Sequence, residues 1–237
     1  MASQAGFIGR IGNVVHYRMG DKFYSRSMPV KYTQTAATKA KASQFGKAST
    51  TGKIIRKELS SVIFNRSDKK MQIQLVKQIV DWFQLLRNKP PSKSRQPENL
   101  IGFHFSTETV RLMNRWTVNI QITIPKPGVV QIKVPAFVPV DQLKAPAGTV
   151  DVICKIATVV IDMEKTTKVD KAINKLSFLY NNDEVSEQTI VQNLKQSDKN
   201  LIITGLSLEY YTSDDDHILP PENQHRMPAE IMHAVYV

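Results

Sequence analysis

Cationic and aromatic side chains alternate near the N-terminus in a pattern that suits the binding of an anionic polymer. The cations are Arg10, Arg18, Lys22 and Arg26, followed by Lys31, Lys39 and Lys41, and the aromatic residues are Tyr17, Phe23 and Tyr24. Lys and Arg neutralise phosphates, while aromatic rings stack on bases. The chain has no homeodomain, zinc-finger or RNA-recognition motif. We therefore predict that any binding of nucleic acid or another polyanion by these cations does not depend on base sequence.

Two other segments have the composition of ligand-binding loops. Asp214, Asp215 and Asp216, followed by His217, form a tight acidic cluster that lacks the spaced ligands and the glycine of a calcium loop. We expect a solvated turn there, with cation binding as the alternative. The segment 46–53 has two glycines and a lysine, but five residues rather than four separate the glycines, and Ile54 stands where a phosphate loop has a hydroxyl. We therefore do not expect a nucleotide site.

The residue types that catalysis needs are present but are not gathered in the sequence. The five histidines are scattered, and none belongs to a His-Glu-x-x-His motif. Cys154 is the single cysteine and lies in an apolar run, where we expect it to be buried and inert. We predict a protein that is not an enzyme and has no catalytic residue, cofactor or metal site. An enzyme acting on a carbohydrate or peptide is an alternative, because Glu108, Asp151 and Asp162 could converge in space.

The charge of the chain is divided between two regions. Residues 1–100 hold 19 Lys and Arg against five Asp and Glu, whereas residues 101–237 hold 13 against 16, so the net charges are +14 and −3. A concentrated positive field attracts phosphates or other acidic surfaces. Neither a secretory signal nor a run of about 18 apolar residues occurs. We expect a cytoplasmic protein, or one incorporated into a particle, that has no membrane partner.

The elements that would position the cations follow from periodicity. Two β-prone runs, 14–19 and 22–27, flank Gly20-Asp21 and predict a hairpin. Small and apolar residues recur at helical spacing from 35 to 64. Gly46 and Gly52 weaken the middle of this stretch by about 1 kcal/mol each relative to Ala, so one helix or two shorter ones would fit.

A second helix is predicted over 68–87, with Ser67 as its N-cap. The Pro-rich segment 88–97 interrupts regular structure and has the composition of a linker or exposed loop. We therefore expect a basic hairpin-and-helix domain at 1–97 and a second domain at 98–237.

Apolar residues occupy alternate positions in much of the C-terminal half, which predicts strands. The first such run contains Trp116, Val118, Ile120, Ile122 and Ile124, and after a turn the second contains Val130, Ile132 and Val134. Further strands are predicted at 150–161, 175–180, 201–211 and 229–237, and a short helix or a mobile connection is predicted at 183–199.

Two of these strands have a predicted inward face. In 201–211 it consists of Ile202, Leu206, Leu208 and Tyr210, and in 229–237 it consists of Ile231, Val235 and Val237. Several short strands separated by turn residues predict an antiparallel sandwich or barrel.

The N-terminal sequence begins with Gly9-Arg-Ile-Gly-Asn-Val-Val-His-Tyr17, continues with Tyr24-Ser-Arg-Ser27 and reaches a helix start at Thr35. These segments resemble a family of uncharacterised Bacteroidetes proteins, which begin with a Gly-x-x-Gly-x-Val-Val segment and a nearby Arg-Ser pair. The resemblance covers about the first 50 residues. It implies a bacterial or bacteriophage origin and transfers no activity or catalytic residue.

These patterns predict an α+β protein, in which an N-terminal β-hairpin and helices precede a C-terminal antiparallel β-sandwich that could be immunoglobulin-like. The first functional hypothesis is a non-enzymatic structural or assembly protein. It would self-associate, or pack against other subunits of a larger assembly, through its basic N-terminal region. The alternative is a sequence-independent nucleic-acid-binding protein that uses the same region.

Overall fold

The computed structural model describes residues 7–28, 34–64, 68–88, 96–105, 110–212 and 227–237. The chain divides into two compact units, Met1–Lys41 and Ala42–Val237. Each unit has antiparallel sheet structure of its own, and helix α1 (Ala36–Glu58) begins in the first unit and ends in the second.

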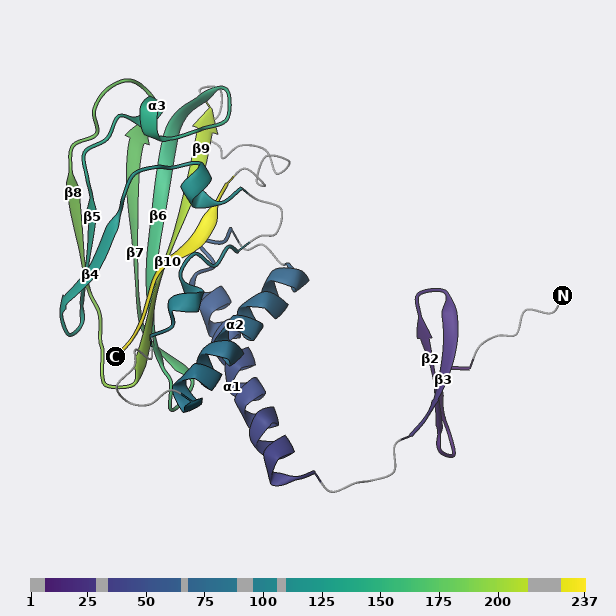
Figure 1. Cartoon of the computed structure of the whole chain (residues 1–237). Coiled ribbons are helices and arrows are strands. Elements are labelled where there is room, and N and C mark those ends of the chain that lie inside the picture. The colour runs from purple at the N-terminus through teal and green to yellow at the C-terminus, as the bar shows by residue number, and fades with distance from the viewer. Residues whose placement is uncertain (1–6, 29–33, 65–67, 89–95, 106–109, 213–226) are drawn as a thin grey trace. The chain divides into compact units, whose positions relative to one another are not determined.

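A small antiparallel sheet of order β1-β2-β3 forms the N-terminal unit (Figure 1). Its strands are β1 (Gly9–Ile11), β2 (Val14–Met19) and β3 (Lys22–Ser27). The predicted hairpin is confirmed, and Gly20 in its turn has a φ of +64°, which glycine adopts without a steric penalty. Strand β1 extends the hairpin to three strands through a second turn at Gly12.

Helix α1 is continuous through Gly46 and Gly52, so the alternative of two shorter helices is wrong. Gly52 is buried where α1 meets the next helix, and a Cβ there would lie only 3.3 Å from a methyl group of Val76. The absence of a side chain therefore lets the two helices approach closely, and this contact offsets the low helix propensity of glycine.

The second predicted helix is confirmed as α2 (Lys69–Asn88). Its N-cap is Asp68, whose Oδ1 accepts hydrogen bonds from the backbone N–H groups of Lys70 (2.8 Å) and Met71 (3.1 Å). The predicted N-cap, Ser67, lies outside the described residues. Both residue types cap helices well, and periodicity locates a helix end only to within one or two residues.

The second unit contains two antiparallel sheets, of order β10-β9-β6-β7 and β4-β5-β8. The four-stranded sheet consists of β6 (Thr149–Asp162), β7 (Thr167–Leu179), β9 (Asn200–Thr212) and β10 (Ala229–Tyr236). The three-stranded sheet consists of β4 (Gln121–Lys126), β5 (Val129–Val134) and β8 (Gln188–Asn193). Short helical turns η1 (Glu98–Leu100), η2 (Leu112–Asn114) and α3 (Pro139–Gln142) lie in the connections.

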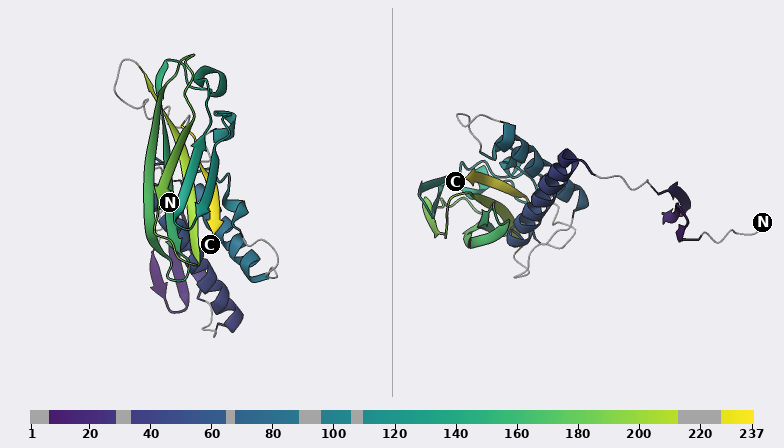
Figure 2. Two further views of the ribbon diagram at one scale, coloured as in Figure 1. Left: turned by 90° about the vertical axis from the view of Figure 1, so that its left-hand side faces the viewer. Right: turned by 90° about the horizontal axis from the view of Figure 1, so that it is seen from below.

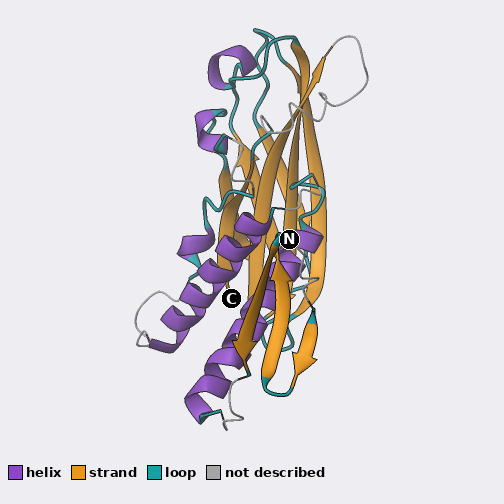
Figure 3. Cartoon of the chain, turned by 90° about the vertical axis from the view of Figure 1, so that its right-hand side faces the viewer, coloured by secondary structure: helices purple, strands orange, loops and turns teal. Residues whose placement is uncertain are grey.

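The central strands β6 and β9 of the four-stranded sheet are buried on both faces, and each face belongs to a separate core. On β6, Val152, Cys154, Ile156 and Val160 pack toward the three-stranded sheet, whereas Ala157, Val159 and Ile161 pack toward the helices. Helices α1 and α2 thus lie on one side of this sheet and β4, β5 and β8 on the other (Figures 1 and 2). Figure 3 faces the helical side and shows α1 and α2 in front of the four-stranded sheet.

Several predicted strands are confirmed, and two segments differ from expectation. The segment 183–199 contains strand β8, which pairs with β5, rather than a helix. Its sequence is mostly polar because β8 is an edge strand that leaves one side exposed. The apolar positions from Trp116 to Ile124 do face the core, but regular pairing begins only at Gln121.

The predicted inward face of 201–211 is confirmed in β9, whereas that of 229–237 is wrong in β10. Ile231 packs toward the helices, while Val235 and Val237 pack toward the three-stranded sheet. The pairing of β10 with β9 shifts register between Ile231 and His233. A bulge of this kind inserts one residue and reverses the faces beyond it, which alternation in the sequence does not reveal.

The described residues form a mixed α+β fold with an N-terminal hairpin. The helices on the N-terminal side of residue 97 share one core with β6, β9 and β10. The predicted division into 1–97 and 98–237 therefore does not coincide with the two compact units, which divide after Lys41.

Strands β7 and β8 hold the two sheets together along one side. The Nε2 of Gln192 donates to the Oδ1 of Asn174 at 2.7 Å. The carboxylate of Asp170 accepts hydrogen bonds from the backbone N–H groups of Lys195 (2.7 Å) and Lys171 (2.8 Å). Because these N–H groups bond to the charged form, they lower the pKa of Asp170.

We expect Gly205→Val to lower the free energy of unfolding by about 2 kcal/mol, because overpacking strains a filled core. A Cβ at Gly205, on the helical face of β9, would lie 3.1 Å from Leu59, the residue that follows α1. Urea unfolding measures the effect, and Gly46→Ala, where a Cβ meets nothing within 4 Å, serves as the control and should be neutral or stabilising. An unchanged midpoint for Gly205→Val would contradict the close packing of α1 on β9.

We expect Asp170→Asn to reduce stability at neutral pH and to have little effect in acid. A carboxyl whose folded-state pKa is lowered stabilises the fold above its ordinary pKa of 3.8, and this contribution is lost as the pH falls through the lower value. The measurement is the unfolding free energy of both proteins at neutral pH and well below pH 3.8. Asp81→Asn is the control, since that exposed carboxylate accepts no hydrogen bond in the described part of the chain.

Candidate functional site

Three of the seven predicted cations lie on one face of the N-terminal sheet. Directly opposed residues share a face, and the register pairs Arg10 with Val15, Val15 with Arg26, and Met19 with Lys22. Because side chains alternate along β2, Tyr17 lies on this face between Val15 and Met19, and it pairs with Tyr24. We call this surface the first face, and it consists of Arg10, Val15, Tyr17, Met19, Lys22, Tyr24 and Arg26.

The first face combines stacked aromatic rings with cations. The rings of Tyr17 and Tyr24 are stacked with their centroids 5.8 Å apart, and the guanidinium of Arg26 lies 5.7 Å from the centroid of Tyr17. The ammonium of Lys22 makes no hydrogen bond or ion pair within the described part of the chain. It is therefore a cation that a partner can reach.

Arg18 lies on the opposite face and is already engaged by the hairpin turn. Its Nε donates to the carbonyl of Gly20 at 2.7 Å, and its Nη2 donates to Oδ1 of Asp21 at 2.9 Å. Its guanidinium also lies 5.9 Å from the ring centroid of Phe23. Arg18 thus stabilises the turn, and it lies on the face opposite Arg10, Lys22 and Arg26.

The other predicted cations lie outside the sheet. Lys39 and Lys41 are exposed on the first turns of α1, and Lys31 lies outside the described residues. No described residue from Phe7 to Lys47 is buried, and Ala48 is the first that is. The sheet and the beginning of α1 therefore show no core of their own.

Asp151 and Asp162, two of the three carboxylates considered as catalytic candidates, do not converge. Asp151 and Asp162 lie near opposite ends of β6, roughly 36 Å apart at the rise of a strand. Oδ1 of Asp162 accepts hydrogen bonds from the backbone N–H groups of Glu164 (2.8 Å) and Lys165 (2.9 Å), and these bonds close the turn after β6. The hydrogen bond from Lys165, and then that from Glu164, lowers the pKa of this carboxyl. Glu108 and the segment 214–217 lie outside the described residues.

Cys154 is fully buried between the two sheets, as its sequence context predicts. Burial raises the pKa of its thiol, because the thiolate would be charged in an apolar core. This side chain fills space and is not a nucleophile.

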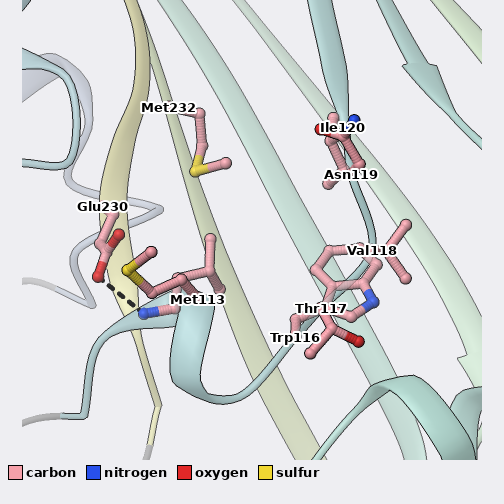
Figure 4. A pocket seen from close by; sticks show the side chains of 9 residues that line it. Met113, Trp116, Thr117, Val118, Asn119, Ile120, Glu230 and Met232 are labelled. Carbon is pink, nitrogen blue, oxygen red and sulfur yellow. Dashed lines mark hydrogen bonds between the residues drawn. The ribbon is translucent and has the colours of Figure 1, made fainter.

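A groove of about 400 Å³ lies on the side of the second unit where β4 and β10 are the edge strands. We call it the β4–β10 groove, and its main lining residues are Met113, Trp116, Val118, Ile120, Glu230 and Met232. Figure 4 shows Glu230 and both methionines on one side and the Trp116–Ile120 segment on the other. The lining is thus apolar except for one carboxylate and short polar side chains.

Glu230 is a buried carboxylate whose two oxygens differ in their surroundings. Its side chain is only 6% exposed, and Oε1 accepts the backbone N–H of Leu112 at 2.7 Å and lies 3.3 Å from Nδ1 of His104. The other oxygen, Oε2, has no hydrogen bond or ion pair to any described residue. Oε2 is not among the buried atoms that lack a hydrogen-bond partner, so solvent reaches it and a donor that enters the groove can bind it.

A second buried charge lies on the helical face of the four-stranded sheet. Lys155 of β6 forms an ion pair with Glu209 of β9, which is 1% exposed, and the hydroxyl of Tyr211 donates to the other carboxylate oxygen at 3.1 Å. Burial, and then the charge of Glu209, raises the pKa of Tyr211 to about 12. With its carboxylate paired and bonded, Glu209 serves the structure rather than a ligand.

Sequence analysis singled out neither Glu209 nor Glu230. Each acidic residue occupies a strand flanked by apolar neighbours, in Leu208-Glu-Tyr210 and Ala229-Glu-Ile231. An acidic side chain inside an apolar strand is the pattern that could have indicated both, since carboxylates are rarely buried without a partner.

Among the described residues, no three His, Cys, Asp or Glu side chains are grouped so that they could hold a metal ion. None of the helices in the same residues combines the length and the apolar composition needed to cross a membrane. Comparison with protein-family models, curated proteins and solved structures finds no match. The Bacteroidetes resemblance remains a prediction.

We expect Glu230→Ala to lower the free energy of unfolding by about 1–3 kcal/mol, because it leaves the buried N–H of Leu112 without its acceptor. Glu230→Gln keeps an amide oxygen at the same position and should retain most of that stability. Thermal and urea unfolding of the two variants measure the difference. If both variants are destabilised equally, the negative charge of Glu230 holds the 110–114 segment in place, rather than the ability of its oxygen to accept the N–H of Leu112.

Proposed function

We propose that this protein is a non-enzymatic structural or assembly protein, and that residues 7–47 pack against other subunits. The observation that carries the proposal is the absence of a buried residue anywhere in the described part of 7–47, although the segment forms three strands and the start of a helix. Eight large apolar side chains within residues 7–28 are exposed: Phe7, Ile8, Ile11, Tyr17, Met19, Phe23, Tyr24 and Met28.

The energetics of small elements support this proposal. A sheet of so few residues needs a second layer against its apolar side chains to be stable in water. The start of α1 has the same deficit, since isolated short helices are marginal and Phe45 on it is 59% exposed. A neighbouring subunit would supply the missing layer, and contiguous exposed apolar surface of this kind marks interaction sites.

The second unit would act as the rigid body of the assembly. Two antiparallel sheets that share one core support a β-sandwich description, to which α1 and α2 add a further layer. An immunoglobulin-like form of this sandwich is the finer proposal. We place the protein in the cytoplasm or in a particle assembled there.

Sequence-independent binding of nucleic acid is the second candidate, and one observation favours it. The first face brings Arg10, Lys22 and Arg26 together with a stacked tyrosine pair, and single-stranded nucleic acids bind to surfaces that combine cations with aromatic rings. Binding of this kind would weaken steeply with salt, whereas packing through apolar side chains would not.

We expect the full chain to form species larger than a monomer in sedimentation velocity, with a mass that grows with concentration. Phe23→Glu together with Tyr24→Glu places charge on both faces of the sheet and should weaken association about 30-fold or more, or roughly 2 kcal/mol. Ile73→Glu together with Lys77→Glu on exposed positions of α2 is a control that should associate normally.

A wild-type protein that stays monomeric at high concentration would contradict the assembly function. The nucleic-acid candidate is measured separately, by fluorescence anisotropy of a labelled oligonucleotide over a series of salt concentrations. Arg10→Ser with Arg26→Ser should abolish binding of the oligonucleotide. Binding that survives this change would show that the first face is not the surface that binds nucleic acid.

A further inference from the structure

We propose that the hairpin tip of one copy, Met19 and Lys22, inserts into the β4–β10 groove of the next copy, where Lys22 pairs with Glu230. This inference rests on the proposed assembly function and names the surface that receives the N-terminal sheet. It also determines the geometry of the assembly, as argued below.

The hairpin tip presents an apolar side chain beside a cation. Met19 and Lys22 are directly opposed on either side of the Gly20-Asp21 turn and lie on the same face. Met19 is 64% exposed, and the ammonium of Lys22 makes no hydrogen bond or ion pair in the described part of the chain. The tip therefore needs an apolar surface that includes an anion.

The β4–β10 groove has the complementary composition. Met113, Trp116 and Met232 supply an apolar and polarisable lining, against which a methionine side chain packs well (Figure 4). The one carboxylate in the lining is Glu230, and its Oε2 has no partner among the described residues. An ammonium is the donor that such an oxygen binds most strongly.

The groove also lies on the side of the two sheets opposite β7 and β8, where no hydrogen bond within the described residues joins β4 to β10. On the β7–β8 side, Gln192 bonds to Asn174 and Asp170 bonds to Lys195, whereas at β4 and β10 core side chains such as Trp116 and Met232 reach the groove wall. An inserted hairpin tip would cover these side chains and would gain for itself the apolar layer that the N-terminal sheet lacks.

The proposed contact joins two different surfaces, so the assembly is heterologous. Each copy offers one tip and one groove, and such head-to-tail contacts produce closed rings or open filaments rather than a symmetric dimer. This consequence allows a test in which two assembly-defective variants restore one contact when they are mixed.

The tip variant carries Met19→Glu and Lys22→Glu, and the groove variant carries Met113→Lys and Glu230→Gln. Met113 is 66% exposed, and Glu230→Gln keeps an oxygen that can accept the backbone N–H of Leu112. Both variants should therefore fold. Circular dichroism and urea unfolding check this. Controls with the same charge changes at exposed positions of α2 are Ile73→Glu with Lys77→Glu for the tip variant, and Ile73→Lys with Asp81→Asn for the groove variant. Both controls should assemble as the wild type does.

We expect each variant alone to be monomeric in sedimentation velocity and an equimolar mixture to form a dimer that does not grow further. The mixture retains one intact tip and one intact groove, which is enough for a single contact. If the groove variant assembles as the wild type does, the inference is overturned while the assembly function stands. If the mixture stays monomeric, the inference is also overturned.

The ion pair is tested by a double-mutant cycle on the association constant. Lys22→Gln and Glu230→Gln should each weaken association about tenfold, and the double variant should be no weaker than either single variant. Effects that multiply, so that the double variant is about a hundredfold weaker, would show that Lys22 and Glu230 do not contact each other. A wild type that never associates would contradict the assembly function itself.

Discussion

Burial of both faces of β6 and β9 is the constraint on which the second unit depends. These long central strands have helices against one face and the three-stranded sheet against the other, and β9 is buried along nearly its whole length. Two buried hydroxyls of this layer, those of Thr158 and Thr204, lie 2.9 Å apart and bond to each other. Gly205 leaves room for Leu59, which follows α1, and Lys155 and Glu209 form an ion pair.

The N-terminal sheet follows the same physical rules with the opposite outcome. Its strands pair correctly and its turns are well formed, yet no described side chain in it reaches a core. Backbone hydrogen bonds alone do not stabilise so small a sheet, because water competes for them. Its apolar side chains and its cations are therefore left exposed, and the mixture of the two is compatible with the proposed protein partner and with a polyanion.

The two ends of the proposed contact are built differently. The hairpin tip projects from a turn and exposes its methionine and lysine, whereas the groove carboxylate is held in place by the N–H of Leu112 and by the packing around it. A fixed anion in an apolar wall discriminates among partners more strongly than an exposed one, since an apolar group placed against it leaves a buried charge unpaired. The second unit would thus determine most of the specificity of the contact. Burial of the exposed apolar side chains of the first unit would supply most of the free energy of association.

The sequence by itself determined the hairpin, both long helices, most strands and the exposed cationic character of the N-terminal region, because periodicity and turn residues are local properties. The burial of Cys154 and the inward face of β9 were predictable for the same reason. Tertiary structure alone decided that Arg18 turns away from Arg10 and Arg26, that a bulge reverses the faces of β10, and that β8 completes a sheet. It also brought Glu230 to the groove and Lys155 to Glu209, pairings between strands that no spacing along the chain encodes.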